Sequence, residues 1–240
     1  ILYKGQDILK LSGSEIRKIR GKEISMIFQD PMASLNPRKK VGDIIGEGLD
    51  IHHLYSSQEE RKAKIDAILK KVGLAPEHYE RYPHQFSGGQ RQRVGIARAL
   101  IMNPSLIIAD ECISALDVSI QAQVVNLMKD IQEETGSAYL FIAHDLSMVK
   151  YISDRIGVLH LGHLLETGTR DEIFGNPTHP YTRGLISAIP APNPEAEKKR
   201  KAIYYDMNEE NIDYNVGSLK NISGTHYVHC TDEEFKKWVN

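Results

Sequence analysis

The stretch from Phe86 to Asp117, FSGGQRQRVGIARALIMNPSLIIADECISALD, constrains the fold more than any other part of this 240-residue chain. Its first half places Ser87-Gly88-Gly89-Gln90 directly before a run with apolar residues at helical spacing. This pattern predicts a glycine turn that opens a helix, where free backbone N–H groups and the positive end of the helix dipole favour an anion. Asn103-Pro104 ends the predicted helix.

The second half of this stretch predicts a strand that ends in two acids. The run from Leu106 to Glu111 is apolar and too short for a helix, which is typical of a strand buried on both faces of a parallel sheet. Its last two residues are Asp110 and Glu111. Ligands of open α/β sheets bind at such strand ends, so the two carboxylates are candidates for a binding site.

Two more apolar runs end in polar residues in the same way. Ile24 to Phe28 precedes Gln29, and Ala138 to Ala143 precedes His144. Each residue alone also fits a structural reading, a polar side chain at a strand end or a satisfied core histidine. Together, the three runs predict one sheet edge that gathers four polar side chains, Gln29, Asp110, Glu111 and His144.

The bulk properties exclude several classes of protein. A net charge of −2 gives no basic surplus for nonspecific nucleic-acid binding. Only Cys112 and Cys230 are present, so we expect neither a disulfide framework nor a four-cysteine metal site, and a cytosolic setting. His52-His53 are interpreted as surface residues because no further ligand stands at metal-binding spacing. Without a long apolar run, we expect a soluble chain whose membrane role comes through a partner.

Helical periodicity dominates the region between the first two strands. Residues 32–82 carry apolar faces on two predicted helices, the second of which is preceded by Ser56-Ser57 and ended by Gly73. Ahead of the first strand we expect an edge strand over 1–8 and a short basic helix over 14–20, and a further helix over 119–134 is closed by Gly136.

The last third of the chain predicts a hairpin and an appendage. Residues 155–159 and 163–167 read as a β-hairpin, and 171–174 and 180–189 as short helices. Pro190 to Pro194 predicts a stiff linker. The charged tail beyond it is too small to hold a core alone, so we expect it to pack on the preceding domain or on a partner.

The central motifs resemble those of ATP-binding cassette (ABC) ATPases. Phe86-Ser87-Gly88-Gly89-Gln90 stands where the family signature Leu-Ser-Gly-Gly-Gln is found, and it is followed at family spacing by the apolar strand, Asp-Glu and Ser-Ala-Leu-Asp. The resemblance implies an α/β fold, the ABC nucleotide-binding domain. In that fold a partial RecA-like parallel sheet joins a helical signature subdomain, here with a small C-terminal extension.

A closer resemblance covers nearly the whole chain. The segments SALDVSIQAQVVNLMKDIQEE, YLFIAHDLSMVKYISDRIGVLHLGHLLETG and NPTHPYTRGLISAIPAPNP are similar to ATPase subunits of bacterial oligopeptide and dipeptide permeases. The tail segments AIYYDMN and GTHYVHC are similar to the F-type subunits of oligopeptide permeases. The resemblance implies ATP hydrolysis that drives peptide import.

The family resemblance also implies roles for individual residues. Asp110 would hold Mg²⁺ through water with a contribution from the Q-loop residue Gln29, Glu111 would polarise the attacking water, and His144 would contact the γ-phosphate. Asp117 would cross a dimer interface, and the turn from Ser87 to Gln90 would close over nucleotide held by the partner. The implied ligands are ATP and Mg²⁺, with catalysis by Glu111 and His144.

The same resemblance predicts domains and partners. The expected parts are 1–31, a core remnant ending in the Q-loop; 32–103, the helical subdomain with the signature loop; 104–189, the core with Walker B, D-loop and H-loop; and 190–240, linker and extension. The implied partners are a second ATPase subunit, D-type in a heterodimer or a copy in a homodimer, two transmembrane permease subunits and indirectly a peptide-binding protein, but no nucleic acid. The expected location is the cytoplasmic face of the membrane.

The chain departs from the family pattern in two places. Cys112 stands where the family has proline, which places a thiol near the expected nucleotide. No G-x-x-x-x-G-K-S/T loop occurs, since the only Gly-Lys pair, Gly21-Lys22, is followed by Glu23. The chain also opens without methionine, so we expect a piece of a longer protein that alone neither binds ATP tightly nor hydrolyses it.

Three other classes of protein share some of these motifs. A DNA-repair or chromosome-structure ABC protein would show long heptad segments and a basic surface, and an ABC translation factor would carry two signatures, whereas this chain has one. A non-catalytic regulatory or interaction module derived from an ABC ATPase stays open. The coding sequence upstream of Ile1 distinguishes this module from an active ATPase, because an in-frame G-x-x-x-x-G-K-S/T there would supply the missing phosphate-binding loop.

Overall fold

The computed structural model describes residues 1–190, 202–207 and 212–239. The chain divides into two compact units, residues 1–144 (the N-terminal unit) and residues 145–240 (the C-terminal unit). The linker predicted over Pro190 to Pro194 lies outside the described residues except for Pro190 itself. The four-part division into 1–31, 32–103, 104–189 and 190–240 stays a prediction.

The N-terminal unit begins with a small hairpin and a capped helix. Strands β1 (Leu2–Tyr3) and β2 (Gln6–Asp7) pair antiparallel, and a 3₁₀ turn, η1 (Ile8–Lys10), leads to α1 (Gly13–Ile19). The Ser12 hydroxyl accepts from the Glu15 N–H, and the Glu15 carboxylate accepts from the Ser12 N–H. This reciprocal capping explains why the predicted basic helix begins where it does.

Three parallel strands form the core of this unit. The strands β3 (Ile24–Ile27), β4 (Leu106–Asp110) and β5 (Ala138–Ile142) lie in the order β3-β4-β5. Their register places Ile27 beside Ala109 and Asp110 beside Ile142, so the three strands end at one edge. Ala109, on the central strand, is fully buried, as expected for a strand of an α/β core.

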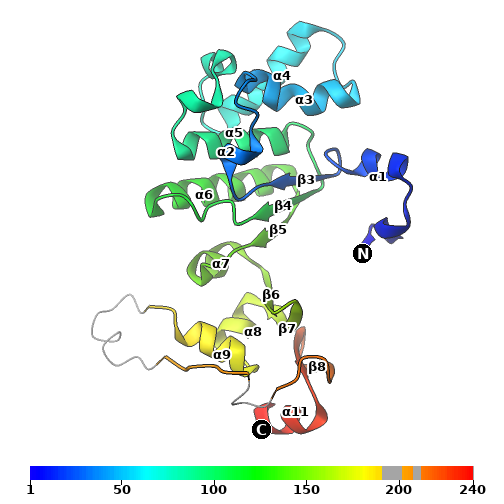
Figure 1. The fold of residues 1–240 in the computed structure, drawn as a ribbon, viewed down its shortest axis with the longest axis vertical. Coiled ribbons are helices and arrows are strands. Elements are labelled where there is room, and N and C mark those ends of the chain that lie inside the picture. The colour runs from blue at the N-terminus through cyan, green and yellow to red at the C-terminus, as the bar shows by residue number, and fades with distance from the viewer. Residues whose placement is uncertain (191–201, 208–211, 240) are drawn as a thin grey trace. The chain divides into compact units, whose positions relative to one another are not determined.

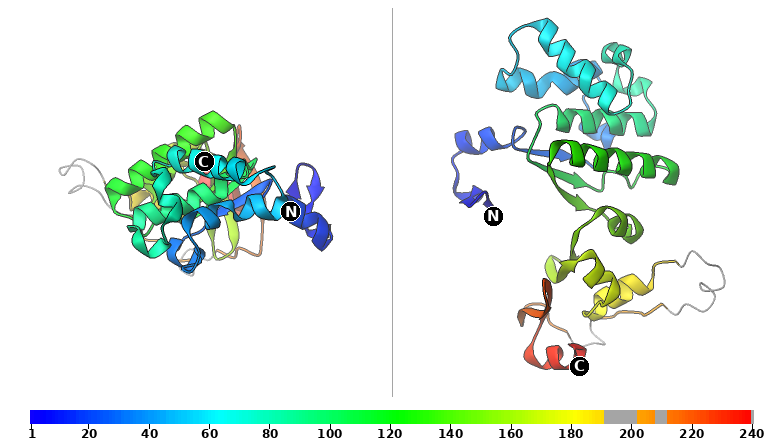
Figure 2. Two further views of the ribbon diagram at one scale, coloured as in Figure 1. Left: turned by 90° about the horizontal axis from the view of Figure 1, so that it is seen from above. Right: turned by 180° about the vertical axis from the view of Figure 1, so that it is seen from behind.

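Helices supply the rest of the N-terminal unit. They are α2 (Pro31–Ser34), α3 (Val41–His52), α4 (Gln58–Lys71), the 3₁₀ segments η2 (Pro76–Glu80) and η3 (Pro83–Gln85), α5 (Gly88–Leu100) and α6 (Val118–Thr135). Figure 1 and the right-hand view of Figure 2 show α3 and α4 packed together away from the strands, with α5 and α6 between these two helices and the parallel sheet. The region between β3 and β4 is therefore helical, as its apolar periodicity predicted.

A buried arginine ties the helical layer together. The Arg61 guanidinium of α4 is only 6% exposed, and it donates to both carboxylate oxygens of Asp50 on α3, at 2.6 and 2.8 Å. It also donates to the Tyr79 hydroxyl at 2.9 Å. Since a buried charge needs partners, this network fixes α3 against α4 and η2.

The C-terminal unit is built on an antiparallel sheet. Its strands β6 (Arg155–His160), β7 (His163–Thr169), β8 (Ser218–Ser223) and β9 (His226–Cys230) lie in the order β6-β7-β9-β8. Its helices are α7 (Leu146–Ile152), α8 (Arg170–Gly175), α9 (Pro180–Ser187) and α11 (Asp232–Val239). The predicted hairpin is β6–β7, and the tail adds β9 directly to it, with Glu166 beside Val228.

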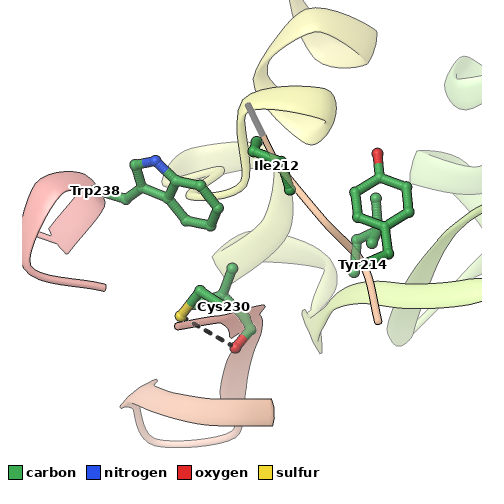
Figure 3. Packing of buried hydrophobic residues seen from close by; sticks show 6 residues of the cluster. Ile212, Tyr214, Cys230 and Trp238 are labelled. Atoms are coloured by element: carbon green, nitrogen blue, oxygen red, sulfur yellow. Dashed lines mark hydrogen bonds between the residues drawn. The ribbon is translucent and has the colours of Figure 1, made fainter. Parts of the chain in front are cut away.

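The tail and the hairpin share one apolar cluster. Leu165 of β7 packs with tail residues that are also buried: Ile212, Tyr214, Val228, Cys230 and Trp238. Figure 3 shows Trp238, Ile212 and Cys230 turned toward one another from three different segments. The expectation that the tail packs on the preceding domain is therefore confirmed.

Four elements of the C-terminal unit, α7, β8, β9 and α11, were not predicted from the sequence. The helix α7 is only seven residues long and buries none of them, the hairpin β8–β9 lacks a clear apolar period, and α11 is charged over most of its length. The hairpin β8–β9 buries His226 beside Val228 and Cys230, and a buried histidine breaks the expected alternation of apolar and polar residues.

Candidate functional site

The polar site lies at the carboxyl edge of the three parallel strands. Gln29 follows β3, Asp110 ends β4 with Glu111 next, and His144 follows β5. Because the strands are parallel and in register, their ends bring these side chains to the same edge.

Glu111 is the side chain on which the others converge. The Gln29 side-chain amide donates to Glu111 Oε2 at 2.7 Å. His144 Nδ1 lies 3.6 Å from the same oxygen, which is ion-pair distance for a protonated imidazole. The glutamate is half-buried, whereas Gln29 and His144 are exposed. The carboxylate is thus held from one side by an amide and lies next to an imidazole that solvent can reach.

The backbone at Glu111 is unusual. Its φ of +40° lies in the left-handed region, which costs a residue with a Cβ about 1–3 kcal/mol. Three hydrogen bonds hold it there: the Glu111 N–H donates to the Ile142 carbonyl at 2.9 Å, and the N–H and hydroxyl of Ser114 donate to the Glu111 carbonyl at 3.1 and 2.9 Å. Strain of this kind is typical of functional positions, and here it turns the carboxylate toward Gln29 and His144.

Cys112 is buried next to the two carboxylates. Its side chain is 2% exposed, and burial, assisted by the negative charge of Asp110, raises the pKa of its thiol to about 12. The residue that departs from the family pattern is therefore a protonated, enclosed thiol. It packs inside the turn and leaves the carboxylates at the surface.

The signature turn opens α5 as predicted. The Ser87 hydroxyl accepts from the Gln90 N–H at 3.3 Å, and the Ser87 N–H donates to Gln90 Oε1 at 3.0 Å. Ser87 itself is exposed. A Cβ built on Gly89 would come within 2.7 Å of Ile120 Cγ2, so glycine permits the start of α5 to approach the start of α6. That contact brings the turn near Asp117, which stands at the N-cap position of α6 without a side-chain capping bond.

The predicted site residues thus form two groups. Gln29, Glu111 and His144 meet through their side chains, with Asp110 adjacent in the chain. The turn from Ser87 to Gln90 lies beside the start of α6 instead. Within the described ranges, no hydrogen bond or ion pair joins this turn to Gln29, Glu111 or His144.

One further residue of this region was missed from the sequence. Gln121, in the first turn of α6, donates through Nε2 to the carbonyl oxygens of Ile113 and Leu116, each at 3.0 Å. Gln121 stands three residues after the start of α6, where a glutamine side chain is more often exposed. Its position in the sequence therefore gives only a weak indication that it binds the turn. Only the folded turn shows that two carbonyl groups face it.

The donor set of the site suits a divalent cation carried by phosphate. Among residues 1–190, 202–207 and 212–239, no cluster of three or more His, Cys, Asp or Glu side chains could hold a metal ion on its own. Asp110, Glu111 and the Gln29 amide are oxygen-bearing groups, and Mg²⁺ commonly takes one or two carboxylates together with substrate phosphates and water. The residues present therefore fit a magnesium–nucleotide better than a permanently bound metal.

In the described part of the chain, no helix is at once long and apolar enough to cross a membrane.

Comparison with solved structures defines the class of protein. A dimeric structure of the ATP-binding cassette MJ0796, in a post-hydrolysis state bound to ADP and phosphate, matches with a TM-score of 0.63 and 30% sequence identity, over 70% of this chain and 72% of that one. The family model for ABC transporters matches residues 1–114, and the model for the oligopeptide/dipeptide transporter C-terminal region matches residues 165–213. The fold is that of an ATP-binding cassette.

Curated relatives narrow the class to one family. The dipeptide transport ATP-binding protein DppF of Lactococcus lactis is 55% identical over 98% of this chain and 74% of its own length. The oligopeptide transport ATP-binding protein OppF of Streptococcus mutans is 56% identical over 98% of this chain and 76% of its own length. This chain belongs to the ATP-binding subunits of oligopeptide and dipeptide transporters within the ABC family. The resemblance seen in the sequence motifs is therefore confirmed.

Proposed function

We propose that this chain is the ATP-hydrolysing subunit that energises the import of oligopeptides or dipeptides through a membrane-embedded ABC permease. One observation carries the catalytic part: the Glu111 carboxylate lies 2.7 Å from the Gln29 amide and 3.6 Å from His144 Nδ1 at the end of a parallel strand. Its relatives, DppF and OppF, are named as dipeptide and oligopeptide transport ATP-binding proteins, which supports the substrate class.

Each residue at the sheet edge has its own role in phosphoryl transfer, a reaction that a protein promotes mainly by positioning the reacting groups and neutralising charge. Asp110 would hold Mg²⁺ through water, and Gln29 would contribute its amide oxygen to the same ion. Glu111 polarises the attacking water, and His144 is placed to contact the γ-phosphate. When bound, Mg²⁺ neutralises charge on the β- and γ-phosphate oxygens.

The contact between Gln29 and Glu111 gives the site a resting arrangement. The Gln29 amide nitrogen donates to the carboxylate, so the amide oxygen, its only oxygen donor for a cation, faces elsewhere. A water molecule that hydrogen-bonds to Glu111 competes with that amide. Binding of nucleotide and water therefore requires Gln29 to move or rotate away from the glutamate.

The signature turn serves a partner. Ser87 is exposed, and the backbone N–H groups at the start of α5 suit an anion. In this proposal the turn from Ser87 to Gln90 closes over nucleotide held by a second ATPase subunit, D-type or a copy of this chain, and Asp117 crosses the interface. Two transmembrane subunits and an extracytoplasmic peptide-binding protein complete the importer, with this chain at the cytoplasmic face of the membrane.

The test is a Glu111→Gln substitution in a form of the protein that carries a G-x-x-x-x-G-K-S/T loop ahead of Ile1. A general base contributes about 10²–10⁴ in rate, so turnover should fall by at least about 10² while the Kd for ATP stays within about twofold. Glu133→Gln, an exposed glutamate on α6, is the matched control and should hydrolyse ATP like wild type. Undiminished hydrolysis by the Glu111 variant would refute the catalytic role.

A further inference from the structure

The turn between β4 and α6 carries an internal brace. Ser114 and Leu116 close two successive turns, through N–H donation to the carbonyls of Glu111 and Ile113, each at 3.1 Å. The Ile113 carbonyl receives a second bond, and the Leu116 carbonyl also accepts one, from the two hydrogens of one nitrogen, Gln121 Nε2, each at 3.0 Å. A single half-buried amide thus pins both ends of the Ile113–Leu116 turn to helix α6.

This turn connects the two groups of site residues. At its start stands Glu111, whose φ of +40° depends on the bonds that its own carbonyl receives from Ser114. At its end stands Asp117, at the N-cap position of α6, where its side chain makes no capping bond. The turn and α6 also lie close to the signature loop. A Cβ on Gly89 would lie 2.7 Å from Ile120, and one on Gly88 would lie 4.0 Å from Leu116.

The chemistry of the brace is specific to a donor side chain. Carbonyl oxygens accept hydrogen bonds and cannot donate, so a side chain that bridges two of them must offer two N–H or O–H hydrogens. An amide or an ammonium meets this need, whereas a thioether of similar length fills the space without donating. Removal of the donor would leave the turn with only its own weak closures, and the strained backbone at Glu111 would lose support.

We propose that Gln121 is a positioning residue for ATP hydrolysis. By bonding to the Ile113 and Leu116 carbonyls, it fixes the turn that orients the Glu111 carboxylate on one side and Asp117 on the other. It does not touch nucleotide. The inference rests on the proposed function and adds a residue to it.

The first test uses the 240-residue chain without nucleotide. In Gln121→Met the amide hydrogens of Ser114 and Leu116 should exchange with solvent about tenfold faster than in wild type, because each net hydrogen bond that restrains local opening is worth a factor of about five to ten. Gln132→Met, on the same helix, is the matched control and should leave those two rates unchanged. Equal exchange in wild type and Gln121→Met would overturn the brace.

The second test measures hydrolysis in the form that carries the phosphate-binding loop. Gln121→Met should lower kcat about tenfold with KM for ATP within about twofold, because only the arrangement around the attacking water is lost. Gln121→Lys, whose ammonium can again donate to both carbonyls, should recover most of kcat. A purely structural glutamine would instead lower the unfolding midpoint of the Met variant and leave its kcat intact, and that outcome would overturn the proposal.

A comparison with Glu111→Gln distinguishes failure of the positioning role of Gln121 from failure of the proposed function. If Glu111→Gln abolishes hydrolysis and Gln121→Met keeps kcat within about twofold of wild type, the positioning role is wrong and the proposed function stands. If Glu111→Gln hydrolyses ATP like wild type, the proposed function fails and the inference fails with it.

Discussion

Glu166 is a fully buried carboxylate that joins three segments of the C-terminal unit. It is 0% exposed on β7 and receives three hydrogen bonds, from the backbone N–H of Thr178 at 2.8 Å, from the N–H of His179 at 2.9 Å and from His226 Nε2 at 2.6 Å. The first two donors stand at the start of α9 and the third lies on β9. We predict that Glu166→Gln destabilises this unit severely, although the substitution preserves size and shape.

The magnitude follows from the number of donors. Oε1 accepts from Thr178 and His226, and Oε2 accepts from His179. In either orientation of a glutamine, its NH₂ group replaces one oxygen and faces a backbone N–H, which loses its acceptor. A buried donor without a partner costs about 1–3 kcal/mol, and the charge-assisted part of the remaining bonds is lost as well. We expect a loss of about 3–4 kcal/mol in the free energy of unfolding, as for other buried pairs with one partner removed.

The assay is urea unfolding followed by the fluorescence of Trp238, the only tryptophan of the chain. Trp238 is buried and its ring centroid lies 5.0 Å from that of His179, whose N–H bonds to Glu166, so its emission reports this unit. Glu233→Gln, an exposed glutamate on α11, is the control and should shift the free energy by no more than about 0.5 kcal/mol. A loss below about 1 kcal/mol for Glu166→Gln would refute the reasoning, since it would mean that the displaced N–H finds another acceptor at little cost.

Two further predictions concern stability. Hydrogen bonds, first from the Thr169 backbone N–H and then from Thr225 and the Thr169 hydroxyl, lower the pKa of Glu172 from 4.5 to about 2. Its stabilising effect is therefore complete above about pH 4.5 and lost as pH falls toward 2, so the stability difference between wild type and Glu172→Gln should shrink over that range in urea titrations; a constant difference would contradict the linkage. In the N-terminal unit, a Cβ on Gly42 would meet the Tyr79 ring at 2.4 Å, whereas one on Gly95 meets nothing within 4 Å. Gly42→Ala should destabilise by about 1–2 kcal/mol and Gly95→Ala should stabilise by about 0.5–1 kcal/mol in thermal unfolding followed by circular dichroism, and equal effects would refute the packing argument.

The sequence predicted the features of the N-terminal unit that local pattern encodes. Strands β3, β4 and β5 are each a short apolar run, so their limits and the polar residues after them could be predicted from the order of residues alone, although β5 itself stays partly exposed. Caps are equally local, since Ser12, Ser57 and Ser87 each bond to the backbone three residues on. Parallel pairing then explains why Gln29, Glu111 and His144 meet.

Features that depend on distant partners could not be predicted. The left-handed backbone at Glu111 depends on Ser114 and on the Ile142 carbonyl of another strand. His226 looks like a surface residue by composition, and its burial makes sense only once Glu166, sixty positions earlier, accepts its hydrogen bond. The hairpin β8–β9 was missed for the same reason, because its pattern of burial follows a polar partner and not an apolar period.

The family match over residues 165–213 describes only part of the folding unit in which it lies. Without β9, β7 would lose its partner along that edge, and the buried Glu166 would lose the His226 bond. Without α11, the indole of Trp238 would no longer cover His179, and the Arg183 guanidinium would lose the Trp238 carbonyl, to which it donates at 3.0 Å. An uncovered carboxylate and an open strand edge are both costly, so the matched segment requires residues 218–239 to bury its own polar groups. The folding unit that contains the matched segment therefore extends through α11, beyond the limit of the family match.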